Sequence, residues 1–202
     1  PSPGHLFRKA MIGAINPTEI KAELHRQIDA FEAALGRPPA FLDSHHHAHQ
    51  FPRIRDLVVS VFLARLSPRR AYMRCCWDSP MRIFRRGVHP WLSLGIALPG
   101  RVLARQAAQF GIPVNQGFSG VHNFSTDTDY GALFSKFVQH QLDGGMIMCH
   151  PGLADDRLAQ LDTVVDAREN EYTWLAGDAM PEAMAAAKTQ LFRLSEILLE
   201  GA

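Results

Sequence analysis

The sequence predicts an α/β protein in which helices alternate with parallel strands, in a sheet that is open or closed into a barrel. Short strand-like runs, such as 40–42, 71–75 and 146–149, alternate with segments of helical periodicity. Clusters of Gly and Pro separate many of these segments. In folds of this class the C-terminal ends of the strands carry the chemistry. Two of these runs, the first and the last, end in histidine-containing motifs.

The first helix is predicted over residues 17–35. Asn16 can cap it, Pro17 suits the first helical position, and Glu19 can complete a capping box. Apolar residues recur at helical spacing to Leu35, and Gly36 then ends the helix.

The rest of the chain continues the alternation, except for residues 77–100. Six Pro and Gly residues interrupt that stretch, so we expect it to be irregular. The other predicted elements are a buried strand over 40–42, a helix from Pro52, a strand over 71–75, a helix over 102–110, a strand over 112–115, a turn over 117–120, a helix over 130–141 and a buried strand over 146–149.

Composition and charge indicate a single globular domain spanning residues 1–202. The 21 basic and 20 acidic residues give a net charge of +1, so no nucleic-acid partner is expected. Three cysteines, two of them adjacent, form neither a disulfide framework nor a paired zinc motif, which favours reduced thiols and a cytoplasmic location. No apolar run approaches the ~20 residues of a membrane-spanning helix. The chain begins with Pro1 in a loop-like sequence, which suggests a fragment.

The most unusual motif is Asp43-Ser44-His45-His46-His47-Ala48-His49, directly after the first predicted strand. Neutral imidazole is a common ligand of divalent metals, and a neighbouring carboxylate can bind the metal or orient a ring. In an extended segment, alternate histidines from His45 to His49 would share a face; on a helical turn, His45 and His49 would pair. We therefore expect a metal site here, with a solvated polar loop as the alternative.

His150 also follows a predicted strand and precedes a Pro-Gly turn, a position suited to a general acid or base. Other histidines, including His122, need no special role, and Glu171 is either a surface charge or part of a pocket rim. Seven arginines between Arg65 and Arg86 indicate a solvated face, or alternatively a surface for an anionic partner such as lipid headgroups.

Phe41 to His49, preceded by Gly36-Arg37-Pro38-Pro39, resembles the signature of the YdjC/ChbG-like carbohydrate deacetylases. Cys149-His150-Pro151-Gly152 and the later segment 166–171 are similar to a second motif of that family. The resemblance extends from about residue 17 to the end and is strongest to the branch associated with hopanoid biosynthesis.

The resemblance implies an irregular (β/α) barrel and removal of an N-acetyl group from an acetylated amino sugar. It implies one divalent metal ion, Mg²⁺ or Zn²⁺, with His45 as ligand and His150 as catalytic acid. Asp43, His49 and Arg74 are expected to support the metal ligands or to bind substrate. A homodimer is left open, and membrane contact is expected only through a lipid-linked substrate.

The chain departs from this family at its start. Members begin with an Ala-Asp-Asp-type motif that supplies a metal ligand and a base, and a Gly-x-His strand supplies a second histidine ligand. Neither motif precedes residue 16, so we expect an N-terminally truncated fragment that lacks the first strands of the barrel and is inactive alone. The alternatives are a glycoside hydrolase, which needs two carboxylates, and a non-catalytic metal-binding domain.

Overall fold

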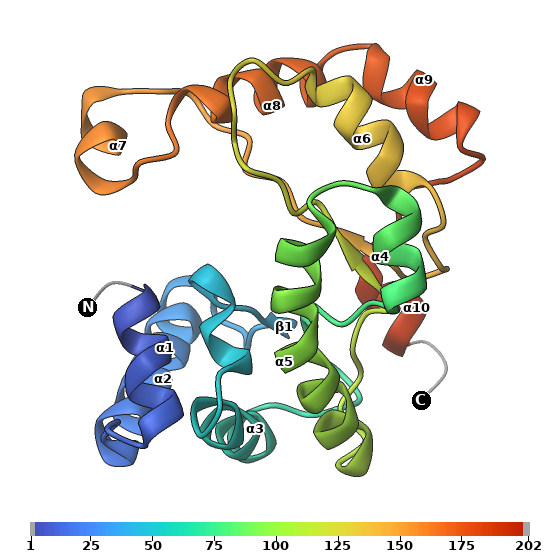
Figure 1. The fold of residues 1–202 in the computed structure, drawn as a ribbon. Coiled ribbons are helices and arrows are strands. Elements are labelled where there is room, and N and C mark those ends of the chain that lie inside the picture. Colours follow the sequence, from blue (N-terminus) through green and yellow to red (C-terminus); the bar gives the residue numbers. More distant parts are fainter. Residues whose placement is uncertain (1–2, 200–202) are drawn as a thin grey trace. The chain divides into compact units, whose positions relative to one another are not determined.

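The computed structural model describes residues 3–199 and shows a helix-rich α/β fold (Figure 1). The chain divides into two compact units. The first comprises residues up to Trp77, Ile96–Gln116 and the residues from Phe192 onward; the second comprises Asp78–Gly95 and Gly117–Leu191.

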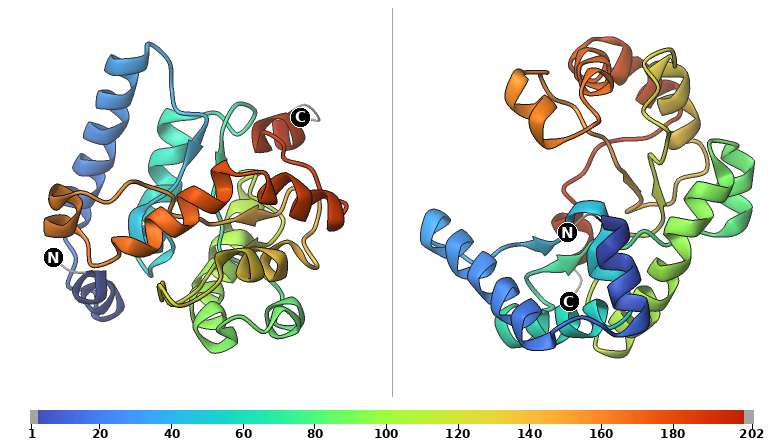
Figure 2. Two further views of the ribbon diagram at one scale, coloured as in Figure 1. Left: turned by 90° about the horizontal axis from the view of Figure 1, so that it is seen from above. Right: turned by 60° about the vertical axis from the view of Figure 1, so that its left-hand side comes forward.

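The first unit contains three parallel extended segments covered by helices (Figure 2). β1 pairs with β2 in the register Phe41↔Tyr72, and Met73 forms a parallel bridge to Val114. Its elements are α1 (Pro3–Ile12), α2 (Pro17–Leu35), β1 (Phe41–Leu42), the 3-10 helix η1 (His45–Gln50), α3 (Ile54–Arg65), β2 (Tyr72–Met73), most of α5 (Pro90–Gln109) and α10 (Leu194–Leu199). Its core centres on Phe62, Met73 and Leu103, which are fully buried.

The second unit is built on a separate parallel pair of strands, in the register Phe118↔Met146. Its elements are α4 (Pro80–Arg86), β3 (Phe118–Ser119), α6 (Tyr130–Val138), β4 (Met146–Ile147), α7 (Asp156–Leu161), α8 (Asp166–Ala176) and α9 (Ala179–Ala186). Tyr130, Phe134 and Met184 form an apolar cluster where α6, α8 and α9 pack together.

The prediction for α2 is confirmed. The Asn16 side chain accepts hydrogen bonds from the backbone N–H groups of Thr18 and Glu19, and Gly36 ends the helix with a left-handed φ of 65°. Glu19 returns to the Asn16 side-chain amide at 2.9 Å, not to its backbone as in a full capping box.

The prediction of irregular structure over 77–100 is wrong, because α4 and the first half of α5 lie there. Pro80 and Pro90 are each the first residue of a helix, where a missing N–H has no cost. Pro99 lies inside α5, followed by Gly100, whose Cβ would come within 2.6 Å of the Trp77 backbone nitrogen. Close packing of α5 therefore outweighs its unfavourable helix propensity.

Three smaller predictions also need correction. The turn expected over 117–120 contains β3, flanked by Gly117 and Gly120 with φ of 101° and 96°. The strand expected over 112–115 reduces to the single bridge at Val114. The last strand is half-buried rather than buried and ends at Ile147.

The paired strands form two separate two-stranded sheets within residues 3–199, not a closed barrel. None of the helices in that range is long and apolar enough to cross a membrane.

Candidate active-site clusters

The histidine cluster of the first unit forms an irregular 3-10 segment, η1, directly after β1. His46 and His47 have left-handed φ values of 50° and 59°, which histidine tolerates better than most residues. These two residues break both geometries that the spacing allowed, the extended face and the single helical turn. The four imidazoles consequently have different environments.

His49 is buried and both of its ring nitrogens are used. Nε2 lies 2.7 Å from the Arg74 carbonyl oxygen, so it carries the proton and donates. Nδ1 accepts from the Ser44 hydroxyl at 2.7 Å, and the same oxygen accepts the His49 backbone N–H at 2.8 Å. Burial, with the nearby Arg74 charge, lowers the pKa of His49 to about 4. His49 therefore holds the loop as a neutral ring.

Arg74 is buried beneath the loop and joins most of its polar groups. Its guanidinium forms an ion pair with Asp43 and donates to the Ser44 carbonyl at 3.1 Å. It also contacts His47 Nδ1 at 2.9 Å and Cys76 Sγ at 2.8 Å. The ion pair between Asp43 and Arg74 thus connects the end of β1 to the segment that follows β2.

His45, in contrast, is exposed. Its ring lies 3.9 Å from the His46 ring, centroid to centroid, and no hydrogen bond to its nitrogens occurs within the described chain. His45 can therefore offer a ring nitrogen to a metal. Between Pro3 and Leu199, however, no three His, Cys, Asp or Glu side chains converge as a metal site.

The second cluster surrounds His150, just beyond β4 in the second unit. The His150 backbone N–H donates to Glu171 Oε2, and Phe124 contacts its ring edge-on at a centroid distance of 4.8 Å. Nδ1 of His150 is buried and has no hydrogen-bond partner among residues 3–199. Burial lowers the pKa of His150, while the Glu171 charge acts in the opposite direction.

Glu171 and His122 form a buried pair that the sequence did not reveal. Their side chains are 1% and 4% exposed, and His122 Nε2 lies 3.0 Å from Glu171 Oε1. His122 Nδ1 accepts the Phe124 backbone N–H at 3.2 Å, so Nε2 carries the proton and the ring is neutral. The signal that the sequence did offer was the similarity of segment 166–171, which ends in Glu171, to the second family motif.

The arginine-rich segment is largely paired rather than a solvated face. Arg86 is buried and, with Arg82, forms ion pairs with Asp78, whose side chain is 1% exposed. Arg65 contacts Asp29 and Glu32 on α2. The alternative of an anionic partner for this segment stays a prediction.

The structure places Asp43, His45, His49 and Arg74 in the first unit and His150 in the second. It brings the first four together around η1 and joins His150 to Glu171 and His122. The assignment of all of them to one active site stays a prediction.

Known proteins similar to this chain include curated deacetylases. A protein named chitooligosaccharide deacetylase from Yersinia pestis (strain Pestoides F) is 31% identical over 153 residues, which are 76% of this chain and 51% of the relative. The protein of that name from Yersinia pseudotuberculosis serotype O:1b (strain IP 31758) matches to the same extent. The chain thus spans about half the length of these relatives.

The fold is similar to a crystal structure described as a candidate cellobiose-phosphate cleavage protein from Enterococcus faecalis V583. The TM-score is 0.67 at 17% identity, covering 91% of this chain and 62% of that one. At this identity the likeness concerns the fold alone. The family model described as YdjC-like protein matches residues 2–186. The chain therefore belongs to the YdjC-like family.

Proposed function

We propose that this chain is part of a metal-dependent enzyme that removes the N-acetyl group from an acetylated amino sugar. Family membership and the deacetylase names of its relatives support this proposal. The observation that carries it is the buried Glu171 carboxylate, which binds both His122 and the backbone of His150 at the end of β4. We further propose that the strands belong to an irregular (β/α) barrel, the fold that the resemblance of the motifs implies.

In this mechanism His150 protonates the leaving amine. An amide nitrogen departs poorly unless it is protonated, so a general acid is needed beside it. Burial lowers the pKa of His150 and makes its imidazolium a stronger acid. The ring is only half-buried, which leaves it accessible to a substrate.

Glu171 positions that acid. Its Oε2 fixes the backbone at His150, and its negative charge stabilises the protonated ring, since it raises the pKa against the effect of burial. His122 donates to the other carboxylate oxygen and orients it. In this assignment Glu171 acts through His150 and does not touch the substrate.

His45 would hold the metal ion, for which we propose Zn²⁺ or Mg²⁺. Its exposed ring, which makes no hydrogen bond among residues 3–199, fits the role of one ligand, and imidazole suits zinc. A bound divalent cation activates water and polarises the amide carbonyl. Asp43, His49 and Arg74 hold the loop that presents His45. We assign the remaining ligands and the proton-accepting carboxylate to the portion of the relatives that this chain does not span.

For the substrate we propose an N-acetylglucosamine unit, with a hopanoid-linked glycan as the specific form, on the basis of the resemblance of the motifs at 41–49 and 149–152 to the hopanoid-associated branch. Three free cysteines, two of them buried, suit a reducing compartment, so we propose a cytoplasmic enzyme.

The structure gives less support to the two alternatives. A glycoside hydrolase needs a pair of carboxylates flanking the bond, yet Asp43 is ion-paired with Arg74 and Glu171 is bound to His122. A non-catalytic metal-binding domain would have no use for the Glu171–His150 arrangement. It would release no acetate and would tolerate loss of His150.

The test uses a protein of the relatives' full length that contains this chain. His150→Ala should lower acetate release from an acetylated chito-oligosaccharide by ~10²–10⁴-fold and leave the metal content unchanged. His45→Ala should lose the metal, whereas His25→Ala on α2 is the control for both properties. The loss at His150 should shrink for an aryl acetate ester, whose leaving group needs no proton.

Three results would contradict the assignment. A shortened glycan in place of free acetate would indicate a glycoside hydrolase. Loss of metal in His150→Ala would make that residue a ligand. Full metal content in His45→Ala would remove it from the metal site.

A further inference from the structure

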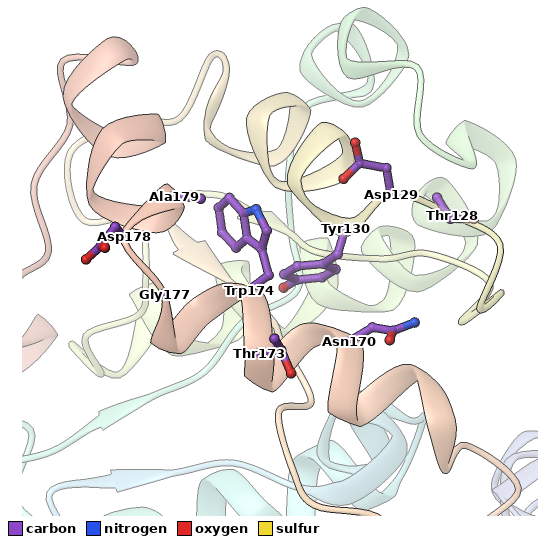
Figure 3. Close-up of a pocket in the computed structure, with 9 residues that line it drawn as sticks. All are labelled: Thr128, Asp129, Tyr130, Asn170, Thr173, Trp174, Gly177, Asp178 and Ala179. Atoms are coloured by element: carbon purple, nitrogen blue, oxygen red, sulfur yellow. The ribbon is translucent and has the colours of Figure 1, made fainter.

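A pocket of ≈ 470 Å³ opens in the second unit, between the start of α6, the second half of α8 and the start of α9 (Figure 3). Its volume lies in the range of small-molecule sites. The indole of Trp174 stands at its centre, with Tyr130 beside it and polar side chains around the edge. All of the lining residues belong to one compact unit.

The aromatic wall of this pocket is held in place by the core. Trp174 packs edge-on against Tyr130 at a centroid distance of 5.6 Å, and its ring is tilted against that of Phe134 at 4.7 Å. Gly131 makes this position available to the indole, because a Cβ there would lie 2.5 Å from Trp174 Nε1. The wall is therefore formed before any ligand binds, which reduces the entropy cost of binding.

Most polar side-chain groups around the wall make no hydrogen bond among residues 3–199. Within the described chain, no hydrogen bond is made by the Trp174 indole N–H or by the side chains of Asn170, Thr173 and Asp178. Asp129 uses Oδ1 to cap α6, through the N–H groups of Gly131 and Ala132, and its Oδ2 stays available. The edge thus offers a mixture of donors and acceptors at several angles, as a hydroxyl-rich ligand requires.

The charged side chains that line the pocket are all acidic. Two carboxylates, Asp129 and Asp178, line it, and no lysine, arginine or histidine does. An anionic ligand such as a sugar phosphate would be repelled. A cation would gain a charge-assisted hydrogen bond to one of the carboxylates, a longer-range attraction to the other, and an attraction to the faces of the aromatic rings.

We propose that this pocket binds a protonated amino sugar, with the pyranose ring against Trp174 and its ammonium group on the side of Asp178, while Asp129, on the opposite side of the aromatic wall, adds a longer-range attraction (Figure 3). The inference rests on the proposed function, because deacetylation converts a neutral acetamide into such an ammonium group. The pocket then holds a deacetylated sugar unit: the product, or a neighbouring unit of a partly deacetylated glycan. Tyr130 links it to the active-site pair, since its ring lies 6.1 Å from that of His122.

The experiment measures binding to this chain alone, without catalysis. D-glucosamine, N-acetyl-D-glucosamine and D-glucose are titrated at pH 6.5 and low, matched ionic strength, and followed by ligand-observed NMR. Glucosamine should bind about two- to fivefold more tightly than the two neutral sugars, the range for exposed ion pairs. High salt should abolish this preference, because it screens exposed charges.

Variants test whether the preference for glucosamine arises in this pocket. Asp178→Asn should remove most of the preference for glucosamine, and Asp129→Asn should reduce it while the cap is kept, because asparagine caps helices equally well. Asp143→Asn, an exposed carboxylate outside the pocket, should change nothing. Gly131→Ala should weaken all three sugars alike by displacing the indole.

Equal affinity for the three sugars would overturn the proposal, and so would a preference that survives Asp178→Asn. An identical loss in Asp143→Asn would show only a net-charge effect and would also overturn it. Acetate release by the longer protein is measured separately. Acetate release without the glucosamine preference would refute the pocket alone, and the preference without acetate release would refute the deacetylase alone.

Discussion

His49 should make the stability of this protein depend on pH, and the size of the effect follows from its environment. Its ring is 3% exposed and neutral, with the Arg74 carbonyl and the Ser44 hydroxyl as partners. Protonation of Nδ1 would remove the bond from Ser44 and place a charge beside the Arg74 guanidinium. The pKa of His49 is therefore lowered from 6.5 to about 4 in the folded chain.

The sign follows from proton binding. Between pH 6.5 and 4 the unfolded chain carries the proton at this position and the folded chain does not, so stability falls as the pH falls. The full stabilisation is present above pH ~6.5. A difference of about 2.5 pKa units corresponds to about 3 kcal/mol in total, of which about 2 kcal/mol is lost between pH 7 and pH 5.

Urea unfolding of the wild type, at pH 7 and at pH 5 with a chelator present, measures the change. His49→Gln cannot take up the proton, so its stability should be lower at pH 7 but should fall by about 2 kcal/mol less between the two pH values. His45→Gln, an exposed ring in the same segment, should behave as the wild type does. The reasoning is refuted if wild type and His49→Gln lose equal stability over this interval.

Two further predictions concern buried groups. Burial raises the pKa of Cys75 to about 11 and of Cys76 to about 12. A thiol reagent at pH 8 should therefore label only the exposed Cys149 in the folded chain, as counted by mass spectrometry. Labelling of two or three thiols before unfolding would contradict this burial. Gly120→Ala should lower the free energy of unfolding by about 3 kcal/mol, because the φ of Gly120 is 96° and a Cβ would lie 2.1 Å from the Met148 carbonyl oxygen. Gly95→Ala, on α5 with open space around it, should raise the free energy of unfolding slightly. Equal effects of the two substitutions would refute the packing argument.

The elements that the sequence predicted correctly are those with local causes. The α2 helix is defined by Asn16, Pro17 and Gly36, each of which acts on its own turn. The short strands at 41–42 and 72–73 lie inside their predicted runs for the same reason. The missed α4 has local causes as well, because Ser79 caps it, Pro80 is its first residue and Gly87 ends it with a φ of 67°. The middle of α5 depends on tertiary packing instead: Gly100 against the Trp77 backbone is a contact that no local pattern contains.

The sequence indicated where the candidate site lies, but not which role each of its residues has. Four clustered histidines indicated chemistry at 45–49, yet the sequence could not reveal that His46 and His47 adopt left-handed backbone angles, which place the four rings in different environments. Nor could it pair His122 with Glu171, which are 49 residues apart. That contact exists only because the segment after β3 and helix α8 meet in the second unit.

The occupancy of ring nitrogens separates structural from chemical histidines in both units. A neutral imidazole has one donor and one acceptor, and a ring that uses both can neither bind a metal nor transfer a proton without breaking a bond. His49 and His122 use both nitrogens. His45 keeps its nitrogens free of hydrogen bonds within residues 3–199, and His150 keeps a buried Nδ1 without a partner there. Each unit therefore contains one histidine whose two ring nitrogens are both hydrogen-bonded and one histidine with a ring nitrogen open to a ligand or a proton. Substitution of His49 or His122 should lower stability, whereas substitution of His45 or His150 should lower activity.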